Sequence, residues 1–253
     1  MANIVAIINH KGGVGKTATT ANLGAALYMR GKRVLLIDMD AQANLTDCLG
    51  ISTEMEKTIY QAMKGQIPLP IVRNEDGLEL VPSCLDMSAI EMEIIQKYAR
   101  EQILHRLLQP MQNRYDYILI DCPPSLSILT INAMTASDSI IIPVEAEYLA
   151  MRGMGRLTNV IRDVKNNLNP NLHISGILIT KYDKRKNFNQ DIKEIIRETF
   201  QGDVFNTSIR TNVAIGEATA SKHDIFHYAP KSTGAEDYST FCDEFLARES
   251  TNH

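Results

Sequence analysis

The chain has 253 residues, of which 44% are hydrophobic and 22% are charged, and its formal net charge is −4 at pH 7. This composition is typical of a globular protein and excludes a disordered or fibrous chain. No apolar run reaches about 18 residues, which excludes a transmembrane helix, and the negative charge restricts any nucleic-acid binding to a local basic patch. The four cysteines are widely spaced and form no Cys-x-x-Cys metal pattern, so we expect a reducing, cytoplasmic setting.

Apolar runs alternate with helical patterns along the whole chain. The alternation predicts a doubly wound, mostly parallel sheet with helices on both faces, in a single domain over 1–253. The predicted strands are Ile4–Ile8, Arg33–Ile37, Leu78–Val81, Tyr117–Ile120, Ser139–Val144 and Ile174–Thr180. The predicted helices are Lys16–Arg30, Met87–Leu108, Ser125–Ala136, Met151–Asn167 and Asn187–Phe200, with a short helix within Met55–Lys64.

A glycine-rich segment follows the first predicted strand and opens the first predicted helix. Residues 11–17 read Lys-Gly-Gly-Val-Gly-Lys-Thr. Glycines let consecutive backbone N–H groups surround an anion, and the helix that follows adds its positive end. In such a loop Lys16 binds phosphate and Thr17 is a ligand of Mg²⁺. The common form of this loop has glycine where this chain has His10, and Lys11 is an additional cation.

Carboxylates end two of the predicted strands. Asp38 and Asp40 follow the second strand, and Asp121 ends the strand that begins at Tyr117. Ligands of open α/β sheets bind at the carboxyl ends of the strands, so these side chains are expected beside the glycine-rich loop. The alternative is that Asp38 and Asp40 cap the next helix.

Together these segments resemble the ParA/MinD family of ATPases with a deviant P-loop. The resemblance rests on Lys11-Gly-Gly-Val-Gly-Lys-Thr17, on the run from Asp38 to Asn44, and on Asp121-Cys-Pro-Pro124. It implies an ATPase that uses ATP and Mg²⁺, in which Lys11 reaches the partner's phosphates across a dimer interface and Asp40 orients the attacking water. The implied catalytic residues are Lys11, Lys16 and Asp40, and the implied Mg²⁺ residues are Thr17, Asp38 and Asp121. The implied nucleotide-binding residues are Lys11, Gly12, Gly13, Val14, Gly15, Lys16, Thr17 and Ala18, with Arg210 and Asn212 on the adenine side.

A second resemblance offers GTP as the alternative nucleotide. The segment Thr180-Lys-Tyr-Asp183 is similar to the Thr-Lys-x-Asp guanine-recognition motif of signal-recognition-type GTPases. The lysine at position 11 favours ATP, because that lysine accompanies the ATP-using members of the ParA/MinD family.

A basic cluster follows the same strand. Its Tyr182-Asp-Lys-Arg185 resembles the Tyr-Asp-x-Arg of short ParA proteins, whose arginine binds DNA without sequence preference. Lysine and arginine contacts to phosphate are independent of sequence and sensitive to salt. The charges on the next helix, 193–198, are interpreted as a solvated face. The candidate DNA-binding residues are Lys181, Lys184, Arg185, Lys186 and the more distant Lys222.

The resemblance implies an ATP-dependent DNA-partitioning protein in the cytoplasm, associated with the nucleoid. Its ATP-bound homodimer would bind non-specific DNA and release it when a ParB-type protein stimulates hydrolysis. The P-loop begins at residue 11, so we expect no N-terminal helix-turn-helix domain. Acids flank the apolar stripe of Phe241, Phe245 and Leu246, which we expect to pack on the sheet and not on a membrane. The alternatives are a MinD-like ATPase that positions a membrane or protein-cluster cargo, a GTP-using targeting NTPase, and a scaffold without hydrolysis.

Overall fold

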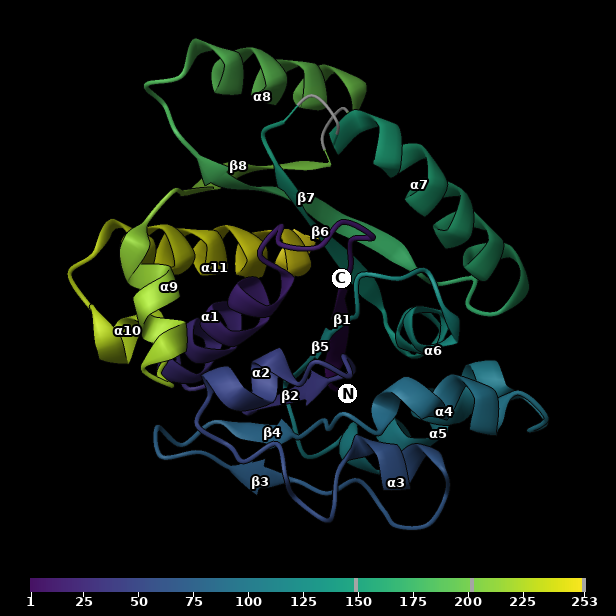
Figure 1. Cartoon of the computed structure of the whole chain (residues 1–253). Coiled ribbons are helices and arrows are strands. Elements are labelled where there is room, and N and C mark those ends of the chain that lie inside the picture. The colour runs from purple at the N-terminus through teal and green to yellow at the C-terminus, as the bar shows by residue number, and fades with distance from the viewer. Residues whose placement is uncertain (148–149, 201–202, 252–253) are drawn as a thin grey trace.

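The computed structural model describes residues 1–147, 150–200 and 203–251. An eight-stranded sheet in the order β3-β4-β2-β5-β1-β6-β7-β8 runs through its centre (Figure 1). Neighbouring strands are parallel except for β3 and β4, which form an antiparallel hairpin at one edge. The strands are β1 (Asn3–Ile7), β2 (Val34–Asp38), β3 (Val72–Arg73), β4 (Glu79–Val81), β5 (Tyr117–Asp121), β6 (Ser139–Glu145), β7 (His173–Tyr182) and β8 (Val204–Arg210).

Helices cover both faces of this sheet, as the alternating pattern predicted. They are α1 (Lys16–Met29), α2 (Asn44–Cys48), α3 (Ile59–Met63), α4 (Met87–Ile94), α5 (Ile103–Leu108), α6 (Ile128–Ala136), α7 (Ala150–Asn167), α8 (Asn187–Thr199), α9 (Val213–Ala220), α10 (Ile225–Tyr228) and α11 (Thr233–Thr251). The predicted fold class and the six predicted strands are confirmed.

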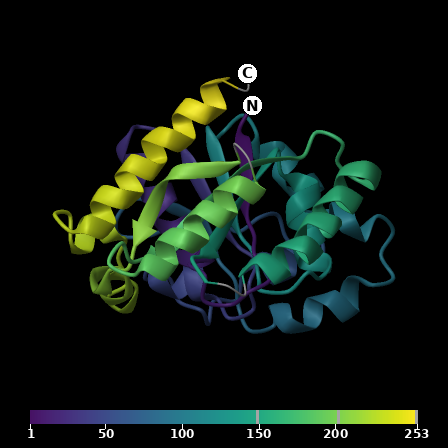
Figure 2. The same ribbon diagram turned by 90° about the horizontal axis from the view of Figure 1, so that it is seen from above.

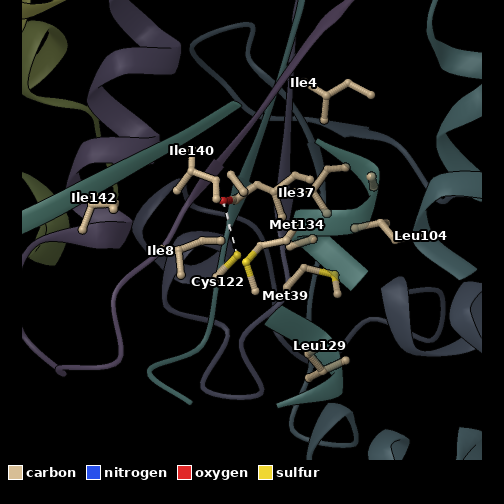
Figure 3. Close-up of a cluster of buried hydrophobic side chains, with 14 of the residues drawn as sticks. Ile4, Ile8, Ile37, Met39, Leu104, Cys122, Leu129, Met134, Ile140 and Ile142 are labelled. Carbon is tan, nitrogen blue, oxygen red and sulfur yellow. Dashed lines mark hydrogen bonds between the residues drawn. The ribbon is translucent and has the colours of Figure 1, made fainter. Parts of the chain in front are cut away.

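The sheet separates two apolar cores, because successive side chains of a strand point to opposite faces. In β2, for example, Leu35 and Ile37 enter one core and Leu36 enters the other. The first core holds side chains of α3 to α8, and Figure 3 shows part of it, including Ile37 of β2, Leu104 of α5 and Met134 of α6. The second core holds side chains of α1, α2, α9, α10 and α11.

The long helix predicted over Met87–Leu108 is wrong. The structure has α4 and α5 there, separated by a turn in which Ala99 has a left-handed backbone with φ 47°. Asn132 of α6 stabilises the break, because its amide nitrogen donates to the Arg100 carbonyl at 2.8 Å and its amide oxygen accepts from the Leu104 N–H at 3.1 Å. The helical periodicity continues through the break, and the residue that stabilises the break comes from a distant segment.

The C-terminal helix α11 packs on the sheet, which confirms the expectation for its apolar stripe. Phe241 lies edge-on to Phe205 of β8, with ring centroids 4.9 Å apart, and Phe245 lies 5.8 Å from Tyr117 of β5. The end of α11 lies beside the start of β1 (Figure 2), where the Asn3 side chain donates to Glu249. Among the described residues, no helix has both the length and the apolarity that a membrane crossing needs.

Candidate nucleotide site

The glycine-rich loop connects the end of β1 to the start of α1 at the carboxyl edge of the sheet. Gly13 and Gly15 have φ of 77° and 88°, a backbone conformation that glycine adopts without strain. Side chains from neighbouring segments hold the loop: Asn9 accepts from the Lys11 N–H at 3.0 Å, and the Thr180 hydroxyl donates to the Val14 carbonyl at 2.8 Å. These contacts from within the protein hold the loop in its shape.

Lys16 begins α1 with its side chain turned inward, and the whole residue is 7% exposed. Its ammonium donates to the Lys11 carbonyl at 3.3 Å. Burial lowers the pKa of Lys16, although the nearby Asp121 opposes the shift. A buried ammonium with one long hydrogen bond is stabilised by an anion, so the loop fits a phosphate group. Gly12 lies exposed in the loop and Ala18 lies in the first turn of α1.

Asp38 and Asp121 lie opposite each other at the ends of the neighbouring strands β2 and β5. Both are buried, and burial raises the pKa of each carboxyl. Repulsion from Asp38 raises the pKa of Asp121 further. Asp121 accepts from the Thr17 hydroxyl at 2.7 Å through one oxygen, while its other oxygen is buried without a hydrogen-bond partner among the described residues. Two adjoining carboxylates and a hydroxyl are ligands that Mg²⁺ prefers, and a divalent cation would offset their repulsion.

Asp38 also caps α2. The alternative that Asp38 and Asp40 cap the next helix is therefore confirmed for Asp38. One of its oxygens accepts from both the backbone N–H and the hydroxyl of Thr46, at 2.9 and 2.7 Å, and Thr46 lies in the first turn of α2. Asp40 does not cap α2, because its carboxylate accepts from the Gln42 N–H at 3.0 Å, ahead of the helix. Asp40 is half-buried at the carboxyl end of β2, and its carboxylate remains open to a further donor.

Burial of Asp38 predicts a pH-dependent stability for the nucleotide-free protein. Its pKa is raised from 3.8 to about 6, so the folded protein keeps a proton that the unfolded chain has released. The contribution of Asp38 to stability therefore falls as the pH rises from about 4 to 6. Between pH 4 and pH 7.5 we expect the free energy of unfolding of Asp38→Asn to rise relative to that of the wild type by up to about 3 kcal/mol. Urea unfolding without Mg²⁺ measures this; a gap that is equal at both pH values would contradict it, and the exposed Asp47→Asn serves as control.

Lys11 projects from the loop toward two carboxylates that were not among the predicted site residues. Its ammonium lies 2.8 Å from Glu145 at the end of β6 and 2.7 Å from Glu147 just after it. Burial by itself would lower the pKa of Lys11, but the hydrogen bonds to the two glutamates outweigh it and raise the pKa. The Lys181 ammonium lies 2.5 Å from the other oxygen of Glu145. Lys11 is therefore held within its own chain, with its side chain 35% exposed.

These missed residues had only weak sequence signals. Glu145 and Glu147 follow an apolar strand, as Asp121 does, and this position was the available clue. Asn9 directly precedes the glycine-rich loop. Thr46 had no signal, because its partner Asp38 lies across a loop whose path the sequence does not specify.

Arg210 ends β8 and Asn212 precedes α9; both were predicted on the adenine side, and both hold this corner together. The Arg210 guanidinium binds Asp237 and Glu236 at 2.6 and 2.7 Å. Asn212 caps α9 by accepting from the Ala214 N–H at 2.8 Å, and it donates to the Thr233 hydroxyl at 2.7 Å. Their contact with adenine stays a prediction.

The basic loop after β7 presents three exposed cations, Lys184, Arg185 and Lys186. The Arg185 side chain is 85% exposed and pairs with Asp183 through two contacts of 3.0 Å. Lys181 instead turns to Glu145 beside the glycine-rich loop. Lys222 lies beyond the other end of α9, 3.2 Å from Asp47 of α2, and none of its described ion pairs or hydrogen bonds involves the basic loop. DNA binding by any of these residues stays a prediction.

Comparisons with known proteins agree with this geometry. A family model described as an AAA domain matches residues 2–174. The chain is 42% identical to the sporulation initiation inhibitor protein Soj of Bacillus subtilis, over 98% of this chain and 99% of that protein. It is 38% identical to the chromosome partitioning protein ParA of Caulobacter vibrioides, over 97% and 94% of the two chains.

A solved structure from Mycobacterium smegmatis, named as cobyrinic acid a,c-diamide synthase with bound ATP analogue and magnesium, is 32% identical. It superposes with a TM-score of 0.89 over 100% of this chain and 98% of that one. The phosphate loop and the paired carboxylates described above are the features that fit ATP and Mg²⁺. The chain therefore belongs to the ParA/Soj family of P-loop ATPases.

Proposed function

We propose that this protein hydrolyses ATP to switch between a DNA-bound dimer and a free form, and that it thereby partitions DNA in the cytoplasm. The observation that carries the proposal is the buried Lys16 ammonium beside the adjoining Asp38 and Asp121 carboxylates, with Lys11 at the surface of the same loop. Relatives named for chromosome partitioning support the biological role. The test is binding of a random-sequence DNA duplex with ATP, ADP, GTP or no nucleotide, and binding with ATP alone is expected.

The loop and its neighbours divide the work of this cycle. When bound, ATP supplies the phosphoanhydride bond that is cleaved, and Mg²⁺ offsets the negative charge of the phosphates. Lys16 and the loop N–H groups bind the phosphates, while Thr17, Asp38 and Asp121 hold the cation. Asp40 accepts a hydrogen bond from the attacking water and orients it. A ParB-type protein is the proposed activator, and an N-terminal DNA-binding domain is not needed for this cycle.

Lys11 must exchange partners in this mechanism. To reach the nucleotide of a second subunit, its ammonium leaves Glu145 and Glu147, which hold it at 2.8 and 2.7 Å. Both pairs are partly solvated, so breaking them costs about 1 kcal/mol or less each. Phosphate charge on the partner can offset that cost, which makes dimerisation depend on ATP.

Lys11→Ala is expected to abolish the ATP-dependent dimer while nucleotide affinity stays within about threefold of the wild type. The reason is that the Lys11 backbone carbonyl, which holds Lys16, is retained, and only the ammonium is lost. Light scattering with a non-hydrolysable ATP analogue measures the dimer, and a fluorescent nucleotide measures the affinity. The exposed Lys57→Ala is the matched control. A dimer of normal stability in Lys11→Ala would contradict the role of Lys11.

Arg185→Glu is expected to reduce non-specific DNA binding by at least about tenfold at physiological salt and to lower its salt dependence, because a phosphate-binding cation becomes an anion beside Asp183. Fluorescence anisotropy with a random duplex and ATP measures this, and nucleotide binding should not change. Arg197→Glu on α8 is the matched control, since that side chain belongs to the charged face interpreted as solvated. Equal loss in both variants would show a general charge effect and not a site at Arg185.

The alternatives receive less support from the site. Guanine recognition would have to displace the Arg185 side chain, which both oxygens of Asp183 bind. That pairing holds the pKa of Asp183 at about 2. A membrane role would need an apolar face at the C-terminus, but Phe241 and Phe245 of α11 are fully buried.

A further inference from the structure

A group of histidines and aspartates lies away from the nucleotide loop, where the β3–β4 hairpin meets α10. Asp76 is at the tip of the hairpin, and His223, Asp224 and His227 surround the start of α10. Ligand atoms of Asp76, Asp224 and His227 lie within 4.8 Å of one another. The cluster therefore joins two segments that are about 150 residues apart in the chain.

Asp224 orients the His227 ring. Its side chain is fully buried, and one oxygen accepts from the N–H groups of Phe226 and His227 at the start of α10. Its other oxygen lies 2.7 Å from His227 Nδ1. A carboxylate in this position accepts the Nδ1 proton, which leaves the Nε2 lone pair of the neutral ring facing outward.

That Nε2 atom faces Asp76 across a gap too long for a hydrogen bond. The distance from His227 Nε2 to Asp76 Oδ1 is 3.8 Å, and the other Asp76 oxygen lies 3.2 Å from His223 Nδ1. Donor atoms that share a tetrahedral Zn²⁺ at bond lengths near 2.05 Å are about 3.3 Å apart. The gap between His227 Nε2 and Asp76 is thus close to the separation of two ligands on a small cation, and the His223 ring lies within hydrogen-bond distance of the same carboxylate.

The hairpin tip that carries Asp76 is held in place. Gly77 has φ 91°, and a Cβ there would lie 2.6 Å from the Tyr28 hydroxyl of α1, so the turn requires glycine. The Asn74 side chain also accepts from the Leu78 N–H at 2.8 Å, which closes the turn. Asp76 is therefore presented to the histidines by a fixed backbone, with its side chain 10% exposed.

We propose that Asp76 and His227 bind a divalent transition metal ion of the Zn²⁺ class, with His223, 3.2 Å from Asp76, in reach as a third ligand and Asp224 as the residue that positions His227. Imidazole and carboxylate ligands favour zinc over Mg²⁺, and His223 and His227 have the His-x₃-His spacing of many zinc sites. Both histidine side chains are partly exposed, at 40% and 45%, which gives the ion access and leaves room for water as a fourth ligand. The bound ion would link the hairpin to α10.

The test is a zinc titration of the metal-free, nucleotide-free full chain in competition with a chromogenic chelator. Excess Mg²⁺ is included to occupy the oxygen ligands at Asp38 and Asp121, because Mg²⁺ competes poorly for imidazole. The wild type is expected to bind one equivalent of Zn²⁺. Asp76→Asn and His227→Gln are expected to weaken binding by more than tenfold, and Asp224→Asn by about 10- to 100-fold. His105→Gln on α5 is the matched control and should bind as the wild type does.

Substitution with Co²⁺ gives a second readout, because the visible absorption of Co²⁺ reports nitrogen and oxygen ligands in a tetrahedral site. Loss of that spectrum in Asp76→Asn, with an unchanged circular dichroism spectrum, would separate loss of a ligand from loss of folding. A wild type that binds no zinc at micromolar concentration would overturn the proposal, as would Asp76→Asn with unchanged affinity. The readouts do not involve ATP, so they stand apart from the proposed ATPase function.

Discussion

Asp40→Ala is expected to lower the rate of ATP hydrolysis by about 10²- to 10⁴-fold, the range typical of a positioned side chain that acts on the attacking water. Asp40 is the half-buried carboxylate of the site, and α2 does not bind it as it binds one oxygen of Asp38. Single-turnover release of phosphate measures the effect, because the rate is independent of binding once ATP saturates the site.

The same variant is expected to keep its affinity for ATP and its ATP-dependent dimer. Loss of one negative charge beside the phosphates would leave binding unchanged or slightly tighter. Asp47→Ala is the matched control, since that carboxylate lies on α2 with 60% of its side chain exposed. If Asp40→Ala hydrolyses ATP at the wild-type rate, the water is oriented by another group and the proposed mechanism is wrong.

Lys16→Ala is expected to reduce nucleotide affinity by roughly 30- to 4,000-fold. Removing one partner of a buried charge pair costs about 2–5 kcal/mol, and each 1.4 kcal/mol is a factor of ten in affinity. The loss should be large because Lys16 is 7% exposed, so water replaces its contact poorly. Isothermal titration with ADP and ATP in the presence of Mg²⁺ measures the affinity.

Lys32→Ala is the control for this substitution, because Lys32 lies between α1 and β2, at the amino ends of the strands and away from the phosphate loop. Folding is checked separately by circular dichroism, since Lys16 is buried at the start of α1. Wild-type affinity in a folded Lys16→Ala protein would mean that the loop N–H groups alone bind the phosphates.

Much of the site was predictable because it is local in sequence. The loop from Lys11 to Thr17 is continuous, and its glycines, lysine and threonine each have a direct role at a phosphate. Asp38 and Asp121 were predictable for a different reason: parallel strands end at one edge of the sheet, so residues that terminate apolar runs meet there.

The sequence patterns failed where a contact from a distant segment decided the structure. The break between α4 and α5 depends on Asn132 of α6. Strand β8 was missed, because its segment Val204–Arg210 has polar residues in the middle and joins the sheet at an edge. Exposed polar positions at a sheet edge weaken the apolar run that identifies a buried strand.

By itself, then, the sequence determined the fold class, the phosphate loop and the strand-end carboxylates, since each depends on periodicity or on residues that are adjacent in the chain. Only the tertiary structure placed Lys11 between Glu145 and Glu147, gave Asp38 a second role at α2, turned Lys181 away from the basic loop, and brought Asp76 to His223 and His227. Those contacts join segments up to about 150 residues apart. Their geometry follows from the path of the folded chain, which residue type and spacing do not specify.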